Sequence, residues 1–140
     1  IRTFSATVRE TVVTRLKVLL DGVTAGFGAR YTLEITDITR AVVNDGAMAE
    51  IARLSANQVV GAKNVVWQPP FMVSEDFSEY AERMPACFML LGSGNPGIGL
   101  AEPHHSPRFD FDEDALPLGA ALLATAATRF LHERAEQRQP

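Results

Sequence analysis

Apolar side chains recur at three- and four-residue steps in three stretches of the chain, which is the spacing of one face of an α-helix. We expect helices over about residues 7–27, 48–60 and 116–131. Ser5 or Thr7 can cap the first helix, and Asn44 or Asp45 the second. The apolar positions of the first helix are Val8, Val12, Leu16, Leu19, Val23 and Phe27.

Other stretches have the patterns of β-strands. Apolar and polar residues alternate over 31–36, which predicts a half-buried strand, and the apolar run 87–91 is typical of a buried one. Residues 1–4 and 65–67 are further strand candidates, and 74–84 a short helix. Strand, helix and strand in succession predict an α/β (α+β) fold with sheet and helices in layers. We place a boundary near Val43.

Composition narrows the class of protein. The chain has 140 residues, of which 46% are hydrophobic and 21% charged, with a formal net charge of -4. This is the size and composition of one globular domain, and it argues against a nucleic-acid-binding surface. No apolar run approaches the roughly 20 residues that span a bilayer. The single cysteine, Cys87, suits a reducing compartment such as the cytoplasm.

The start of the chain is unusual for a natural gene product. Residues 1–4 contain no initiator methionine and have the pattern of a strand already in progress. We expect the chain to be truncated and to lack part of a folding unit.

A pair of histidines, His104 and His105, lies in a loop just before the last predicted helix. Neutral imidazole is a common ligand of transition metals, so this loop is a candidate metal site. A catalytic zinc site needs about three protein ligands, and no complete set is visible here. A solvated surface loop is the alternative.

Two other segments have candidate chemistry. Glu75 and Asp76 are adjacent carboxylates at a predicted helix start, where they can bind metal or substrate, although helix capping explains them as well. The glycine-rich loop 92–97 follows a predicted strand but lacks the lysine of a phosphate-binding loop, which favours a plain connection.

The order of four segments resembles the metal-dependent amidohydrolases, a group that includes aminoacylases, hippurate hydrolases and indole-acetyl-amino-acid hydrolases and belongs with the zinc carboxypeptidase-like exopeptidases. The segments are Arg-Thr-Phe-Ser at residues 2–5, Val-Asn-Asp at 43–45, Met-Val-Ser-Glu-Asp-Phe at 72–77 and His-Ser-Pro-Arg-Phe-Asp-Phe at 105–111. The resemblance covers essentially the whole chain.

The resemblance implies a two-domain enzyme with a mixed-sheet catalytic domain and a smaller lid of sheet and helices. Residues 1–43 would be the second half of the lid, which often forms the dimer contact, and residues 44–140 the C-terminal part of the catalytic domain. The full-length enzyme would hold two divalent ions of zinc, manganese, cobalt or nickel and act as a homodimer on a small substrate, with no nucleic-acid or membrane partner.

The same resemblance gives roles to individual residues. His105 corresponds to the family's last metal ligand, whereas His104 stands where leucine is common and receives no role. Glu75 and Asp76 lie in a segment beside the substrate cleft. Arg2 and Asn44 would touch the substrate carboxylate or support the lid.

The family's other metal ligands and its general base belong to an N-terminal half that these residues do not include, so no catalytic residue is expected here. We therefore expect a parent enzyme that hydrolyses the amide bond of N-acyl amino acids or related small amides, with this chain alone inactive. The alternatives are a metallo-dipeptidase or carboxypeptidase of the same superfamily, and a non-catalytic dimerisation or binding domain.

Overall fold

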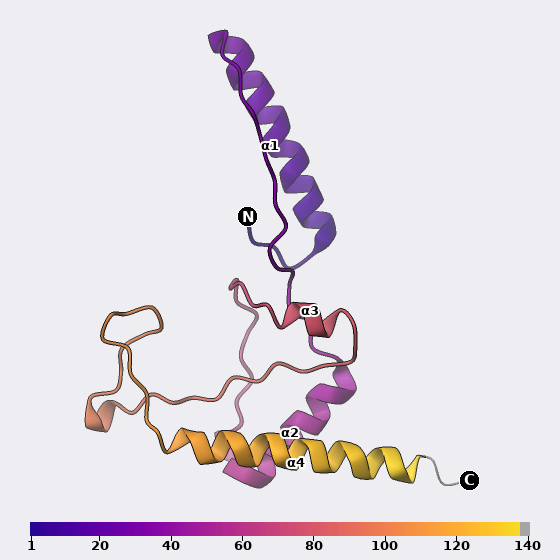
Figure 1. Ribbon diagram of the computed structural model, residues 1–140, viewed down its shortest axis with the longest axis vertical. Helices are drawn as coiled ribbons and strands as arrows, with labels where there is room; N and C mark the ends of the chain where they lie inside the picture. Colours follow the sequence, from indigo (N-terminus) through magenta and orange to yellow (C-terminus); the bar gives the residue numbers. More distant parts are fainter. Residues whose placement is uncertain (138–140) are drawn as a thin grey trace. The chain divides into compact units, whose positions relative to one another are not determined.

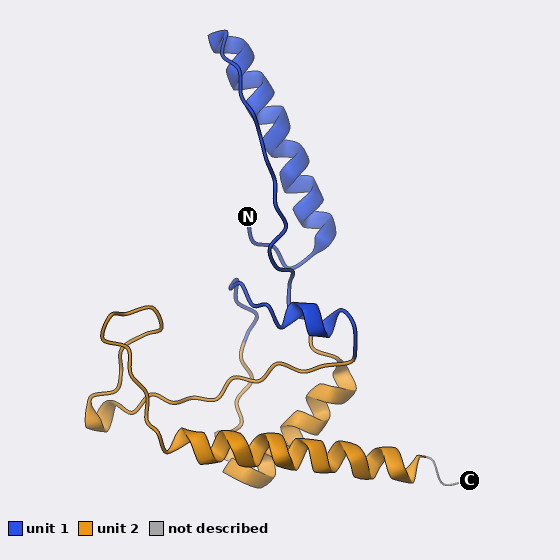
Figure 2. Ribbon diagram, in the orientation of Figure 1, with its two compact units in different colours: residues 1–43, 69–84 blue, residues 44–68, 85–140 orange. Residues whose placement is uncertain are grey.

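The computed structural model describes residues 1–137 and divides the chain into two compact units. Unit 1 consists of residues 1–43 and 69–84, and unit 2 of residues 44–68 and 85–140 (Figure 2). The helices labelled in Figure 1 are α1 (Ala6–Phe27), α2 (Gly46–Val60), α3 (Ser78–Ala81) and α4 (Ala115–Glu136). Two short 3-10 turns, η1 (Ala62–Asn64) and η2 (Pro96–Ile98), complete the order.

The long helices confirm the predictions made from apolar spacing, and local chemistry sets their ends. Ser5 caps α1, because its Oγ accepts a hydrogen bond from Val8 N at 3.3 Å. Gly28 ends α1 in the left-handed conformation, with φ 63°. Asp45 caps α2 through Oδ1, which accepts from Met48 N at 3.0 Å. These contacts join near neighbours in sequence, which is why the sequence alone could predict them.

The segment after α1 runs back along that helix as extended chain (Figure 1). Tyr31 Oη donates to Asp21 Oδ1 at 2.7 Å, and Arg9 forms an ion pair with Asp37. Side chains therefore hold this segment to α1, and its backbone has no neighbouring strand. Leu33 is half-buried, but Tyr31 stays exposed.

The predicted α/β (α+β) fold is wrong. Residues 1–137 contain no β-strand and no sheet, so neither the sheet of the expected lid nor the mixed sheet of the expected catalytic domain is present. An isolated bridge between Asn95 and Leu100 is the β-type pairing found. Alternation indicates which side chains are apolar, but a strand also needs a hydrogen-bonded neighbour. The segments 1–4, 31–36, 65–67 and 87–91 find none.

The core of unit 2 lies where α2 packs against α4. Ile51 and Ala52 on α2 are buried, as are Ala115 and Leu122 on α4. Ser55 is also fully buried, and its Oγ donates to Ile51 O at 2.7 Å. The internal bond satisfies the hydroxyl, so Ser55 takes its place in this contact without an unpaired polar group.

Unit 1 buries much less apolar surface. No residue of α1 is buried, and Phe27 is 86% exposed. In α3, Ser78 is fully buried and its Oγ accepts from Arg40 N at 3.3 Å. The short helix spans four residues, so the predicted helix over 74–84 exists only in part. Polar contacts along α1 and around Ser78 therefore join the segments of unit 1.

Within residues 1–137, none of the helices combines the length and the apolar content that crossing a membrane requires.

Replacing the cap of α2 tests how far local contacts stabilise unit 2. We expect Asp45→Ala to lower the free energy of unfolding by about 1 kcal/mol, because Met48 N loses its acceptor. Asp45→Asn should keep most of the stability, since asparagine caps helices as well. Urea unfolding followed by circular dichroism measures both. Equal unfolding free energies for the two variants would contradict the assignment of Asp45 as the cap.

Candidate functional site

The histidine loop, residues 101–111, consists of two tight turns in succession. Ser106 N donates to Pro103 O at 3.1 Å, and Phe109 N donates to Ser106 O at 3.0 Å. His105 is the third residue of the first turn and has φ 68°, the one positive φ among the non-glycine residues described. For a residue with a side chain, this left-handed backbone conformation is less favourable than the right-handed one by roughly 1–2 kcal/mol. Glycine is the usual residue at this turn position, so the positive φ of His105 makes its side chain a candidate for a function.

The carboxylate of Glu102 connects the two turns through hydrogen bonds. Its Oε2 accepts from Ser106 Oγ at 3.1 Å, and its Oε1 accepts from Arg108 Nη2 at 2.7 Å. Ser106 Oγ in turn accepts from Arg108 N at 3.2 Å. Charge-assisted bonds of this kind are stronger than neutral ones. The backbone around His105 is therefore fixed by contacts that leave its ring unused.

The two histidines differ in their surroundings. The His104 ring packs edge-on against Phe109, with ring centroids 4.8 Å apart. The His105 side chain is exposed and makes no hydrogen bond or ion pair within residues 1–137. Its ring nitrogens are thus available to a ligand that approaches the loop.

The base of the loop is closed by Asp112. Asn95 Nδ2 donates to Asp112 Oδ2 at 2.6 Å, and Asp112 N donates to Ser93 O at 2.8 Å. Asp114 N donates to the other carboxylate oxygen at 3.0 Å. The bonds from Asn95 and Asp114 favour the charged carboxylate and lower the pKa of Asp112. No pattern in the sequence connects Asp112 with Asn95, because the two residues lie in different segments.

Three predicted substrate-binding residues lie in unit 1. Arg2 Nη1 donates to Met72 O at 3.0 Å, which brings Arg2 to the segment that contains Glu75 and Asp76. Glu75 Oε1 accepts from Phe77 N at 3.2 Å, and Asp76 O accepts from Glu79 N at 2.9 Å. The carboxylate of Glu75 thus helps to start the turn that leads into α3, but neither Glu75 nor Asp76 caps the helix, whose N-cap, Phe77, makes no side-chain capping bond. The roles of both acids toward a substrate stay predictions.

Asn44 lies in unit 2 and is bound to the backbone of Phe88. Its Oδ1 accepts from Phe88 N at 2.8 Å, and its Nδ2 donates to Phe88 O at 3.2 Å. The amide therefore pairs with the backbone of Phe88 as one residue of a neighbouring strand would. These two bonds leave the amide with a second N–H donor and a second acceptor lone pair, so the role of Asn44 toward a substrate stays a prediction.

The residues described do not form a complete metal site. Within 1–137, no three His, Cys, Asp or Glu side chains lie close enough together to hold an ion. His105 can supply one ligand. Burial raises the pKa of the Cys87 thiol, which disfavours the thiolate that binds metals. A site that uses His105 therefore needs ligands from beyond these residues.

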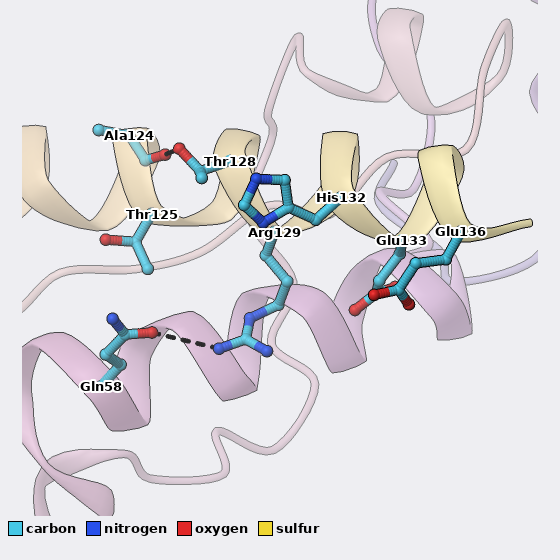
Figure 3. A pocket seen from close by; sticks show the side chains of 8 residues that line it. All are labelled: Gln58, Ala124, Thr125, Thr128, Arg129, His132, Glu133 and Glu136. Carbon is cyan, nitrogen blue, oxygen red and sulfur yellow. Dashed lines mark hydrogen bonds between the residues drawn. The ribbon is translucent and has the colours of Figure 1, made fainter.

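A hollow of about 620 Å³ lies between α2 and α4 (Figure 3). Arg129 Nη2 donates to Gln58 Oε1 at 3.2 Å, while Arg129 Nε is buried and has no partner in the described chain. None of the predicted site residues lines the hollow, although His132 does. Its lining consists of Gln58, Ala124, Thr125, Thr128, Arg129, His132, Glu133 and Glu136. Because an arginine lies beside two glutamates, the lining favours neither an anionic nor a cationic ligand, and we assign the hollow no role.

Comparison with known proteins gives one family and several relatives. The profile of peptidase family M20/M25/M40 matches residues 4–129. IAA-amino acid hydrolase ILR1-like 6 of Arabidopsis thaliana is 32% identical over 84% of this chain and 26% of its own length. N-acetylcysteine deacetylase of Bacillus subtilis is 32% identical over 94% of this chain and 33% of its own.

A third relative extends the range of named activities. Thermostable carboxypeptidase 1 of Saccharolobus solfataricus is 33% identical over 68% of this chain and 22% of its own length. The chain thus spans between about a fifth and a third of the length of these relatives. No solved structure matches it significantly.

The backbone conformation of His105 leads to a prediction about stability. We expect His105→Gly to leave the unfolding free energy unchanged or to raise it by up to about 1 kcal/mol, because glycine adopts a positive φ without steric cost. The neighbouring change His104→Gly serves as control, and it should destabilise the loop because it removes the contact with Phe109. Urea unfolding compares the two. If both changes destabilise equally, His105 is not strained.

The lowered pKa of Asp112 predicts an acid-sensitive loop base. A carboxyl whose pKa is lower in the folded than in the unfolded chain stabilises the fold fully above the unfolded pKa, for which the reference value is 3.8. That stability is lost as the pH falls through the folded pKa. Asp112→Asn should therefore flatten the acid limb of the unfolding free energy against pH. An unchanged acid limb would argue against the bond from Asn95.

Proposed function

The chain belongs to peptidase family M20/M25/M40, and from this premise we propose that its parent enzyme hydrolyses the amide bond of N-acyl amino acids or related small amides. The relatives include a hydrolase of IAA-amino acids and a deacetylase of N-acetylcysteine, whose named substrates are amino acids acylated on nitrogen. Hydrolysis of an amide or peptide bond is common to the relatives' names. The acyl-amino-acid substrate is our narrower proposal.

The observation that carries the proposal is the conformation of His105. This residue is held at a positive φ by two turns and the Glu102 network, and its ring is exposed. Backbone strain at a single residue points to a function of its side chain. Members of the family generally depend on metal ions, so we propose His105 as one metal ligand.

The metal site needs a contribution from outside the described residues. His105 is a single donor, and two ions of zinc, manganese, cobalt or nickel would require several more. We propose that the other ligands and the general base belong to a part of the parent enzyme not included here. Histidine nitrogen suits each of these metals, so the choice among them is left to metal analysis.

The other predicted residues are proposed to bind the substrate. Arg2 uses Nη1 for Met72 O, and its remaining guanidinium donors suit a substrate carboxylate. Glu75 and Asp76 lie in the segment that follows Met72 and would border the same cleft. We propose that Asn44 supports the chain at Phe88 and that its second N–H donor and second acceptor lone pair suit a substrate.

We also propose the domain roles, assembly and location given by the resemblance. Residues 1–43 would belong to the lid and carry the contact of a homodimer, which the exposed apolar side chains of α1 support, and residues 44–140 would belong to the catalytic domain. A single free cysteine supports a cytoplasmic location. Small amides or peptides are the expected binding partners.

Two alternatives compete with this function. The carboxypeptidase relative favours an enzyme that cleaves peptides with the same metal centre. The lack of a complete ligand set in the described residues favours a non-catalytic domain. The first differs in substrate, whereas the second differs in whether metal-dependent hydrolysis occurs at all.

The decisive experiment compares His105→Ala with His104→Ala in the full-length gene product. We expect His105→Ala to lower the metal content and to reduce the hydrolysis of N-acetylcysteine or indole-acetyl amino acids by more than about 100-fold. His104→Ala should keep both, because that ring packs on Phe109. Metal analysis by mass spectrometry and assays of amine release measure the effects.

The outcomes separate the three functions. Preference for dipeptides over acyl amino acids would support the peptidase. A wild-type protein without metal-dependent hydrolysis would support the non-catalytic domain. Unchanged metal content and activity in His105→Ala would refute the assignment of His105.

A further inference from the structure

Asn95 and Asp112 form a clasp that closes the chain on both sides of the histidine loop. The bond from Asn95 Nδ2 to Asp112 Oδ2, at 2.6 Å, joins residues 17 positions apart. A backbone bond from Asp112 N to Ser93 O, at 2.8 Å, lies beside it. His105 lies on the loop between the two ends. The clasp therefore fixes both points at which this loop leaves the rest of unit 2.

The polar atoms of the clasp are occupied within the chain. Asn95 Oδ1 accepts from Gly97 N at 3.2 Å, and Asp112 Oδ1 accepts from Asp114 N at 3.0 Å. The backbone of Asn95 also pairs with Leu100 in both directions, at 2.7 and 3.0 Å. With these partners, the side chains of Asn95 and Asp112 are suited to holding the backbone and poorly suited to binding a substrate.

Asp112 also connects the loop to the core. Its carbonyl accepts from Ala115 N at 3.0 Å, at the first residue of α4. Ala115 itself is buried, and so is Leu122, which lies about two turns further along the same face of α4. The packing of α4 therefore sets the position of the clasp, and the clasp in turn sets the position of the loop.

We infer that Asp112 is a positioning residue that acts through the loop on His105, with Asn95 as its partner. This inference rests on the proposed function in one respect, that His105 is a metal ligand. Asp112 holds the loop base while Glu102 holds the turns, and the two together keep His105 in its positive φ. Neither side chain contacts the imidazole, so the effect is transmitted through the backbone.

Exchanging the two side chains tests the clasp. Asn95→Asp alone places two carboxylates against each other and removes the donor, so we expect the loop base to open. In the double variant Asn95→Asp/Asp112→Asn, every bond can form again. The new amide donates to the new carboxylate, and the acceptors for Gly97 N and Asp114 N remain.

The first measurement follows the loop itself, in the 140-residue chain. We expect the amides of Ser106 and Phe109, which close the two turns, to exchange with solvent at least about tenfold faster in Asn95→Asp. The NMR signature of a positive φ at His105 should weaken along with them. In the double variant both should return to within about threefold of the wild type.

The second measurement uses the full-length protein from which metal has been removed, titrated with zinc. The affinity for added zinc should fall about 10–100-fold in Asn95→Asp and recover in the double variant. A merely structural role of Asp112 would leave zinc affinity unchanged once the helices show normal circular dichroism, and this result would overturn the inference.

The amide exchange of the loop shows, independently of catalysis, whether Asp112 positions the loop. If amide exchange is unchanged in Asn95→Asp, or if the double variant folds but is not rescued, Asp112 does not position the loop. If His105→Ala leaves zinc binding intact, the proposed function fails, and the exchange data still report on the clasp.

Discussion

The packing of α2 against α4 is the contact on which unit 2 depends. It buries Ile51, Ala52 and Leu122, and it fixes the first residue of α4, Ala115, in the same core. Asp112 is bound to that first turn, and the histidine loop is bound to Asp112. The position of an exposed side chain, His105, thus derives from a small apolar contact through a short series of hydrogen bonds. Rigid support of this kind is what a metal ligand requires.

The helices could be predicted from the sequence because their causes are local. Apolar spacing predicts α1, α2 and α4, and the predicted caps Ser5 and Asp45 begin α1 and α2 through bonds to residues a few positions away. The strands could not be predicted in this way. Alternation over 31–36 predicts a half-buried strand, but Tyr31 binds Asp21 on α1 and the segment has no neighbouring strand. Strand pairing depends on distant segments, and no local pattern specifies which ones.

The same division applies to the candidate site. His105 could be selected from the sequence because it stands in a recognisable block before Ser106 and Pro107. Its positive φ and its support by Glu102 and Asp112 could not, since these arise from turns and side-chain bonds that the block does not specify. Asn44 is a similar case. Its amide is engaged with Phe88 in unit 2, a contact that no pattern in the sequence indicates, and its role toward the substrate or the lid stays a prediction.

The chain belongs to peptidase family M20/M25/M40 and holds one histidine, His105, in a supported loop. The proposed function depends on whether His105 binds a metal. The most direct test is an anomalous-scattering crystal structure of the metal-loaded full-length protein. We expect an imidazole nitrogen of His105 at about 2.0–2.1 Å from an ion such as zinc. A fully occupied metal centre whose ligands do not include His105 would contradict it.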